Sequence, residues 1–427
     1  NWLLDADNIN GYGADGQLTA TEIADIKVIS LFEKGIANLK GIEYFTSMTE
    51  LYLDGNPLTS VDVSMHPQLE TLWIGFLNLT SIDLSNNTKL KSMGFTGNQF
   101  SSFDFTKFPD LEVLLIGNNP MTSIDLSQNP KLYQLTITQV PVTSLNLSAN
   151  TALEVLIAGQ NQLTSLDLSQ NTALKSLVLN DSELTDLDLT KNTALTSLRM
   201  ENGSLKSIDL SKNVSLGSLY IKNSKLTSLV VRNLESLKDL SVPDNTELTN
   251  LVCDNTSLTS INVSGCTSLN SLRCRGNDLT YINVSGLTAL ETFYCGQNKL
   301  TTLNASGCTS LKELDCCNNF IRDEGMDDML SNLPTVASGE LFVYNEEAPD
   351  GNIMTTEQVA TAISKGWHPK YLKDGWKDYT GGSAGISTIE NDAMTNKRYY
   401  TLDGRKLQGE PTQKGMYIVN DKKVVIK

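Results

Sequence analysis

LEVLIAGQNQLTSLDLSQNTA, residues 153–173, is one copy of a unit that recurs every 21 residues along most of the chain. LEVLLIGNNPMTSIDLSQNPK at 111–131 and LNSLRCRGNDLTYINVSGLTA at 269–289 are two further copies. Their shared pattern is LxxLxLxxNxLTSLDLSxNxx, in which we number the first leucine as position 1. Copies begin at residues 48, 69, 90, 111, 132, 153, 174, 195, 216, 248, 269 and 290, with a longer opening unit at 26 and a partial one at 311. The chain therefore holds about fourteen repeats.

The LxL part of each unit predicts a short strand, because alternate residues of a strand point to opposite faces. One repeat cannot bury its leucines alone, so successive repeats are expected to stack into a solenoid with a parallel sheet along one side. Position 9 predicts an asparagine ladder whose amides satisfy buried backbone groups. Its members are Asn56, Asn98, Asn119, Asn161, Asn277, Asn298 and Asn319.

This pattern resembles the leucine-rich-repeat family between about residues 26 and 320, and the 21-residue length with its LxSLDLS half resembles the internalin-type surface proteins of bacteria. The resemblance implies an α/β leucine-rich-repeat solenoid. We expect a curved right-handed superhelix of mostly parallel strands with few helices, capped at both ends and followed by a small β module. Such a scaffold serves many partners, so the resemblance implies binding without naming a ligand.

The segment LKDLSVPDNTE at 237–247 interrupts the 21-residue spacing. It aligns with the second half of a unit, LTSLDLSQNTA, and therefore predicts an extra half-coil of eleven residues. Two interpretations are open: a bulge left by unequal duplication, or a functional protrusion or kink.

The cysteines follow the repeat. Cys253, Cys274, Cys295 and Cys316 share the inward position 6, and Cys266 and Cys308 share position 19, with Cys317 beside them. An exported protein with seven cysteines invites disulfides, but the odd count and the inward register favour buried thiols that act as small apolar side chains. A zinc site is disfavoured because its ligands would have to converge within one coil.

The first 47 residues predict an N-terminal cap with a helix, opened by a capping box of Thr19 and Glu22. Within the cap, Asp15 and Glu22 occupy positions 5 and 12 of a calcium-loop pattern, with Asp5 and Asp7 upstream. The candidate calcium ligands are therefore Asp5, Asp7, Asp15 and Glu22. The alternative is an Asp/Gly-rich turn that leads into the helix. No other cofactor is expected.

The repeats proper span 48–320, and residues 321–379 predict a C-terminal cap with helices at 323–333 and about 356–365 and a strand from 340. Residues 380–393 have the composition of a linker. Residues 394–427 predict a small β tail of charge +5. Through YTLDGRKL, KGMYIV and KKVVIK this tail resembles the sorting segments of secreted Bacteroidetes proteins; the alternative is a basic hairpin that docks on the acidic body.

Composition excludes several classes of function. Asp and Glu number 49 against 33 Lys and Arg, and the resulting charge of −16 disfavours nucleic acid as a partner. Two histidines, His66 and His368, are too few for a histidine cluster or a His-rich zinc site. Phosphate loops, GxSxG, HExxH and paired CxxC motifs are absent, so we expect no enzyme. No apolar run of about 18 residues predicts a transmembrane helix.

Position 5 lies at the centre of the predicted concave face and collects apolar, aromatic and arginine side chains, the types that dominate binding surfaces. The alternative is that strands favour such residues anyway. The candidate ligand-binding residues are Tyr52, Trp73, Leu115, Ile157, Val178, Arg199, Tyr220, Arg273 and Tyr294. At position 15 a row of aspartates could bind cations, or could bond to turn amides. Its members are Asp62, Asp83, Asp104, Asp125, Asp167, Asp188 and Asp209, with Asn146 among them.

These observations predict an exported or cell-surface adhesion protein that recognises a protein ligand, from the host or from a bacterial surface, through its concave face. A glycan ligand stacked on Tyr52 and Trp73, and a structural spacer of the cell envelope, are the alternatives. We expect a monomer whose signal segment has been removed.

Overall fold

The computed structural model describes residues 12, 16–381, 399–400, 415–419 and 422–426. The chain forms two compact units, Asn1–Leu248 and Thr249–Lys427.

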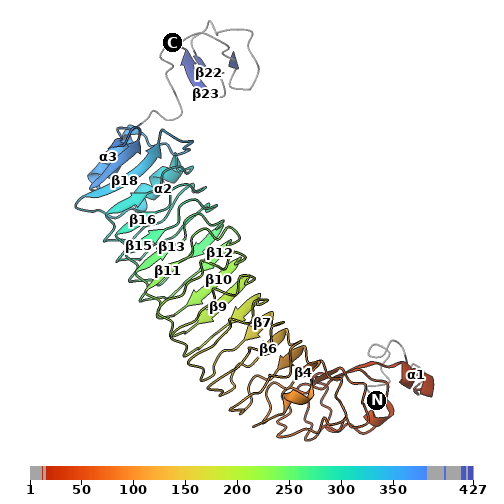
Figure 1. The fold of residues 1–427 in the computed structure, drawn as a ribbon. Coiled ribbons are helices and arrows are strands. Elements are labelled where there is room, and N and C mark those ends of the chain that lie inside the picture. The colour runs from red at the N-terminus through yellow and green to blue at the C-terminus, as the bar shows by residue number, and fades with distance from the viewer. Residues whose placement is uncertain (1–11, 13–15, 382–398, 401–414, 420–421, 427) are drawn as a thin grey trace. The chain divides into compact units, whose positions relative to one another are not determined.

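The first unit is a stack of coils that each contribute one short strand to a parallel sheet (Figure 1). After helix α1 (Ala20–Asp25), strand β1 (Val28–Ser30) and a 3-10 turn at Ile42–Tyr44, the strands recur with the repeat. They are β2 (Glu50–Tyr52), β3 (Thr71–Trp73), β4 (Ser92–Gly94), β5 (Val113–Leu115), β6 (Gln134–Thr136), β7 (Val155–Ile157), β8 (Ser176–Val178), β9 (Ser197–Glu201), β10 (Ser218–Lys222) and β12 (Asp239–Ser241), with β11 (Ser228–Val230) in a second row. From β2 onward each residue pairs with the residue 21 positions later, as Leu156 does with Leu177.

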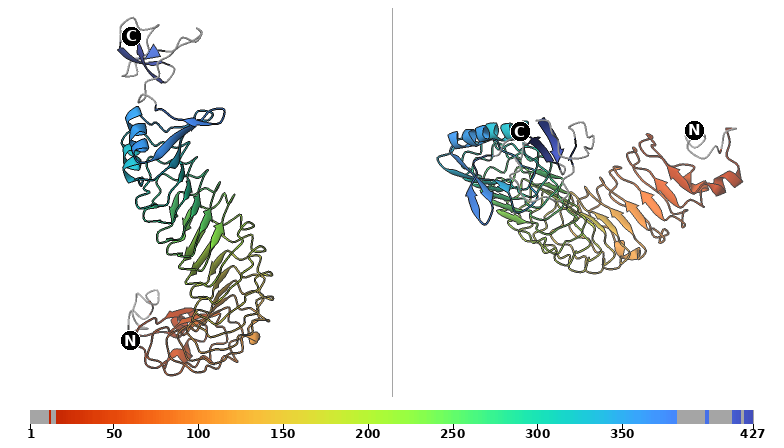
Figure 2. Two further views of the ribbon diagram at one scale, coloured as in Figure 1. Left: turned by 90° about the vertical axis from the view of Figure 1, so that its left-hand side faces the viewer. Right: turned by 90° about the horizontal axis from the view of Figure 1, so that it is seen from above.

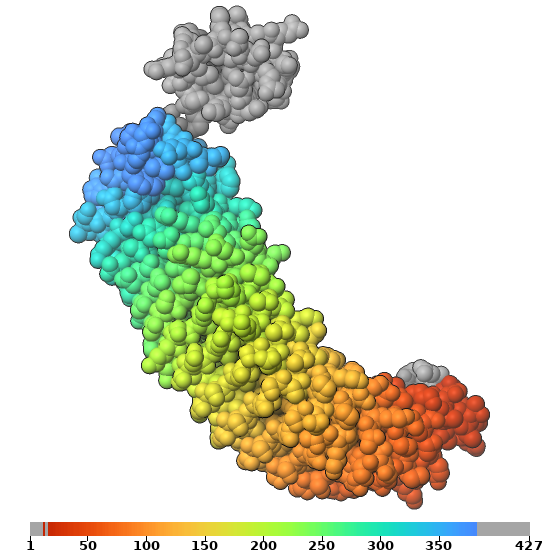
Figure 3. All heavy atoms as spheres, viewed as in Figure 1, coloured from red at the N-terminus to blue at the C-terminus, as the bar shows by residue number. Residues whose placement is uncertain are grey.

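The alternation of the LxL pattern decides which side chains form the core. The leucines at position 4, such as Leu114 and Leu156, are completely buried, and those at position 6 lie beside them inside the coil. Positions 3 and 5 point the other way, and we call the surface that they form, together with position 7, the strand face. The strands line one side of this unit, and turns form its opposite side (Figure 2). In Figure 3 the colours follow one another in order along this unit, as expected if each coil packs against its neighbours.

Two asparagine ladders hold successive coils together. At position 9, Asn98 donates from Nδ2 to the carbonyls of Ile74 and Phe95 at 2.8 and 3.0 Å, and its Oδ1 accepts from the Leu79 N–H at 2.9 Å. A second ladder at position 19 was not predicted. There Asn150 donates to the carbonyls of Leu126 and Asn129 at 3.1 and 2.8 Å. The members of this second ladder, all completely buried, are Asn87, Asn129, Asn150, Asn171, Asn192 and Asn213.

The half-coil at 237–247 corrects the alignment made from the sequence. Its residues form the first half of a repeat rather than the second, because β12 pairs with β10 in the repeat register, Leu219 with Leu240 and Tyr220 with Ser241. Asn245 takes the role of a position-9 asparagine and donates to the Ile221 and Val242 carbonyls at 2.8 and 2.7 Å. The segment therefore lacks the second half of its repeat.

In the second unit β13 (Asn250–Val252), β15 (Ser271–Arg273), β16 (Thr292–Tyr294), β17 (Glu313–Asp315), β18 (Gly339–Asn345) and β19 (Trp367–Leu372) are parallel, and β20 (Trp376–Asp378) closes the row antiparallel to β19. Strand β14 (Ser260–Asn262) lies in the other half of its coil. Helices α2 (Glu324–Asn332) and α3 (Thr356–Ser364) lie side by side at the end of this unit (Figure 1). Trp367 is completely buried and donates from Nε1 to the Pro334 carbonyl at 2.9 Å.

The C-terminal helices lie within one residue of their predicted ranges. Asp323 precedes α2, and its side chain makes no capping hydrogen bond. Helix α3 has a complete capping box of Thr355 and Gln358, and Gly366 follows it with a φ of 85°. Helix α3 therefore ends at a glycine, which tolerates the left-handed backbone conformation.

Within the predicted β tail, β21 (Tyr399–Tyr400), β22 (Gly415–Val419) and β23 (Lys422–Ile426) form a three-stranded antiparallel sheet. The predicted linker lies outside the described residues, except for 380 and 381. The described helices are too short to cross a membrane. The predicted solenoid of mostly parallel strands with few helices is confirmed.

Candidate functional site

All nine candidate ligand-binding residues lie on the strand faces, each at position 5 of a repeat strand. The first unit brings seven of them into one row of position-5 residues. These are Tyr52, Trp73, Leu115, Ile157, Val178, Arg199 and Tyr220. The second unit places Arg273 and Tyr294 side by side on its own strand face. Each unit therefore carries its own group of candidate residues.

The row in the first unit is half-exposed along most of its length. Leu115, Ile157 and Val178 keep part of their surface in solvent, and Arg199 is fully on the surface. Gly94 interrupts the row and is buried. Partly exposed apolar side chains on a hydrogen-bonded ladder offer area that a partner can cover without first ordering a loop.

Two aromatic rings meet at the start of this row. Tyr52 and Trp73 are 5.4 Å apart between ring centroids, in an edge-to-face arrangement. The Tyr52 hydroxyl donates to the Glu50 carboxylate at 2.7 Å. Burial and this bond to a carboxylate together raise the pKa of Tyr52 to about 12. Tyr52 is therefore neutral throughout the physiological range.

An arginine stacks on the tyrosine at the other end of the row. The Arg199 guanidinium lies 4.2 Å from the centre of the Tyr220 ring, and it forms an ion pair with Glu201. The Glu201 carboxylate balances the charge of the guanidinium, and the Tyr220 ring covers its planar face.

The second unit has a larger group of the same kind, of which the sequence predicted only two members. Arg273 and Arg275 lie 5.5 and 4.6 Å from the centre of the Tyr294 ring. Arg273 forms an ion pair with Asp254 at 3.1 Å, and Arg275 reaches Asp315 two coils away. Arg275 and Asp254 occupy position 7, where most other repeats carry small or uncharged residues, and that contrast could have revealed them.

The sequence also missed an aromatic group on the C-terminal cap. Phe342 of β18 continues the position-5 row by pairing with Asp315, and its ring lies 4.5 Å from that of Trp376 on the edge strand β20. Tyr379 contacts Tyr344 and Tyr371 nearby. The cap falls outside the repeat, so no periodicity pointed to these rings.

The aspartates at position 15 form turns. Each side chain accepts the backbone N–H of the residue two positions later, at 2.8–3.2 Å, and Asn146 does the same. Hydrogen bonds to the side-chain hydroxyl and the backbone N–H of that residue together hold the pKa of each aspartate below its ordinary value; the hydroxyl bond is the larger cause for Asp104 and Asp188, and the backbone bond for the other five. The turn interpretation of this row therefore accounts for its carboxylates.

The calcium prediction involves residues that mostly lie outside the described part of the chain, namely Asp5, Asp7 and Asp15. Glu22 is described, and its carboxylate accepts the Thr19 N–H at 2.7 Å to complete the capping box of α1. Among the described residues, no three His, Cys, Asp or Glu side chains are grouped so that they could hold a metal.

The seven cysteines are buried and free. Cys308 donates from Sγ to the Val284 carbonyl at 3.0 Å, the same bond that the position-19 asparagines make to the preceding coil. Burial raises the pKa of Cys308 to about 11 and holds the pKa of Cys253, Cys295 and Cys316 well above the ordinary thiol value. They therefore pack as thiols, not as thiolates.

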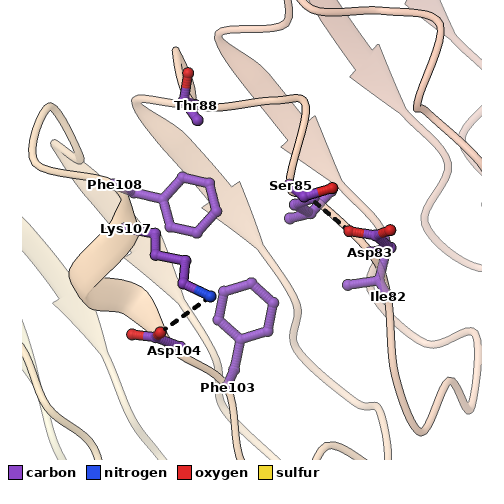
Figure 4. A pocket seen from close by; sticks show the side chains of 9 residues that line it. Ile82, Asp83, Ser85, Thr88, Phe103, Asp104, Lys107 and Phe108 are labelled. Carbon is purple, nitrogen blue, oxygen red and sulfur yellow. Dashed lines mark hydrogen bonds and ion pairs between the residues drawn. The ribbon is translucent and has the colours of Figure 1, made fainter.

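A small hollow of about 240 Å³ opens on the turn side of the first unit, where phenylalanines replace the usual Leu and Asn (Figure 4). Phe103 and Phe108 form one wall, and Lys107 is paired there with Asp104 at 3.4 Å. Asp83, on the facing coil, accepts the N–H of Ser85. The charged groups of this hollow already have partners within the chain.

Comparison with known proteins gives structural neighbours only: no protein-family profile matches the chain, and no curated protein matches its sequence. The functional domain of InlJ from Listeria monocytogenes is 27% identical, with a TM-score of 0.52 over 77% of this chain and 76% of that one. That domain is described as including a cysteine ladder. An internalin (inlF) of Listeria monocytogenes is 22% identical with a TM-score of 0.40, over 72% of this chain and 85% of its own.

A leucine-rich-repeat protein of Leptospira interrogans is 18% identical with a TM-score of 0.42, over 81% of this chain and 95% of that one. The repeat register, the parallel strands and the likeness to the InlJ domain agree with one another. The chain has the leucine-rich-repeat fold, and its structural neighbours include internalins.

Proposed function

We propose that the chain is an exported or cell-surface binding protein, without catalytic activity, that recognises a protein ligand through the strand face of its first unit. The observation that carries this proposal is the in-register row from Tyr52 to Tyr220. Its centre is half-exposed and consists of Leu115, Thr136, Ile157 and Val178, three of them apolar, and its ends carry aromatic rings and an arginine. Aromatic and arginine anchors around an apolar centre are the composition of protein-binding surfaces.

The chemistry of the remaining polar residues supports binding over catalysis. The aspartate row is engaged in turns, and the thiols are buried. His66 is buried at the start of the first unit and contacts the Ile42 carbonyl through Nε2. Asp83, Asp104 and His66 border hollows of the surface, but each is held by a hydrogen bond within the chain.

A glycan ligand is the second candidate, favoured by the flat placement of one indole. The Trp73 ring lies over Gly94, and its Nε1 donates to Ser92 Oγ at 3.0 Å. An indole held along a strand face can stack on a sugar ring.

The test is binding of the folded chain to a glycan array and to a panel of host matrix and cell-surface proteins, with and without calcium. Ile157→Asp places a charge in the apolar centre and is expected to weaken a protein ligand about tenfold or more. Val214→Asp, on the turn side where Val214 is 57% exposed, is the matched control and should bind normally. Loss with Trp73→Ala alone would favour a glycan. Binding that neither Ile157→Asp nor Trp73→Ala alters would overturn the proposal.

A further inference from the structure

We infer that the depression beside Trp73 is a subsite for an arginine side chain of the protein ligand. This inference rests on the proposed function and names the chemical group that this part of the strand face recognises.

The depression has a volume of about 380 Å³ and lies across β3, β4, β5 and β6 of the first unit. Trp73, Ser92 and Leu115 line it on the strand face, and Glu112 and Tyr133 line it at position 2 of their repeats. It is open to solvent, so a side chain of a partner can enter without any movement of the backbone.

The missing side chain at Gly94 makes room for the Trp73 indole. Gly94 occupies the position of the row that follows Trp73, and a Cβ there would approach Trp73 Cγ to 2.8 Å. The indole therefore lies across β4, anchored at its nitrogen by Ser92 Oγ and contacted at its other side by the Tyr52 ring. Its remaining surface borders the depression.

The charges around the depression favour a cation. Glu70 is paired with Lys91 at 2.7 Å, which neutralises both. Glu112, one coil further on, is half-buried and forms neither an ion pair nor a side-chain hydrogen bond within the part of the chain that the structure describes. Lys91, which also lines the depression, attracts the Glu112 carboxylate but makes its direct ion pair with Glu70. The depression thus has two carboxylates to one ammonium beside Trp73 and Tyr133, and the whole chain carries a charge of −16.

Two other aromatic rings of this chain already bind an arginine side chain that is paired with a carboxylate. On Tyr220 the neighbouring coil supplies Arg199, which pairs with Glu201. On Tyr294 the neighbouring coil supplies Arg273, which pairs with Asp254. At Trp73 the aromatic ring and a carboxylate are present, but the preceding coil supplies Tyr52 in place of an arginine and the following coil supplies Gly94. A planar guanidinium supplied by a partner would stack on the indole and donate to Glu112.

The experiment uses the full chain and follows the indole N–H signal of Trp73 by NMR. The chain has four tryptophans, and Trp73→Phe identifies the signal by its loss. The probes are Nα-acetyl-arginine methylamide and its neutral isostere Nα-acetyl-citrulline methylamide, each up to tens of millimolar, with methyl glucoside as the saccharide probe. We expect a saturable shift with the arginine probe and binding about tenfold weaker, or none, with citrulline.

Three variants test the geometry. Glu112→Gln should abolish the preference for arginine over citrulline, whereas Glu154→Gln, at the same repeat position but paired with Lys175 at 2.7 Å, should leave it intact. Gly94→Val keeps every charge but displaces the indole, so it should abolish binding of the probe. Circular dichroism tests whether each variant is folded. If Gly94→Val is misfolded, the comparison of Glu112→Gln with Glu154→Gln decides the test.

Equal shifts with arginine and citrulline, a response to the glucoside alone, or no shift of the Trp73 signal would each overturn the inference. None of these outcomes affects a protein ligand that is lost with Ile157→Asp, so the proposed function would stand. Conversely, an arginine-specific shift without any protein ligand on the panel would leave the subsite in place and remove the proposed function.

Discussion

Each aspartate at position 15 makes the stability of the folded chain depend on pH. Asp125 accepts the Ser127 N–H at 2.9 Å, and this bond holds its pKa below the ordinary value. Because the folded pKa is the lower one, the bond stabilises the folded chain above the unfolded pKa of about 3.9 and is lost as the pH falls through the folded pKa. Seven aspartates share this arrangement. We expect the urea midpoint to fall steeply below about pH 4.

Asn146 supplies the control for that prediction, since it accepts the Ser148 N–H at 3.0 Å without a charge. Replacing Asp125, Asp167 and Asp188 together by Asn should leave the urea midpoint at pH 7 nearly unchanged and reduce the loss in acid. The corresponding Ala variant should lower the midpoint at both pH values. Equal behaviour of the Asn and Ala variants would show that the turn bonds do not contribute.

The buried thiols make a second prediction at this scale. All seven cysteines are free and buried, and burial raises the pKa of Cys308 to about 11. A thiol must be exposed and ionised to react, so the native chain at pH 8 should show none of its seven thiols to Ellman's reagent within minutes. The unfolded chain should show all seven. A fast-reacting thiol in the native chain, or a disulfide detected by mass spectrometry, would contradict the packing described.

At the scale of the coil, the asparagine ladders stabilise the stack because each amide satisfies carbonyls that would otherwise be buried unpaired. Asn119 donates to the Phe95 and Ile116 carbonyls at 2.9 and 3.0 Å and accepts the Phe100 N–H at 3.1 Å. Asn119→Ala should lower the free energy of unfolding by about 1–3 kcal/mol. The control is Gln128→Ala, in the exposed turn of the same coil, which should cost much less. Urea unfolding measures both, and equal losses would mean that the ladder does not couple the coils.

The repeat strands could be predicted because only one register buries both apolar residues of LxL, as Leu114 and Ile116 show. Their bounds differ slightly from LxL, since most strands span positions 3–5. The half-coil at 237–247 could not be placed, because both halves of the repeat share the pattern LxxLxLxxN. The row from Tyr52 to Tyr220 follows from the register as well. Arg275 and Glu112 do not, because their roles depend on contacts across coils, such as that of Arg275 with Asp315.

At the scale of the whole molecule, the excess of acidic residues decides how a partner approaches. A charge of −16 attracts a basic partner before contact, and salt screens that attraction. If the ligand presents an arginine to Trp73, its association rate should fall as NaCl rises from about 50 to 500 mM, a range over which the screening length shortens from above 10 Å to below 8 Å. Surface plasmon resonance measures the association rate and the dissociation rate separately.

Short-range contacts act on the dissociation rate. Glu112→Gln and Trp73→Ala should mainly speed dissociation, because they remove contacts made only in the complex. An association rate that increases with salt would indicate a partner of the same charge sign and would contradict an arginine at this subsite. Salt-sensitive association together with faster dissociation in both variants requires long-range attraction by the whole acidic chain and local recognition at one depression of its strand face.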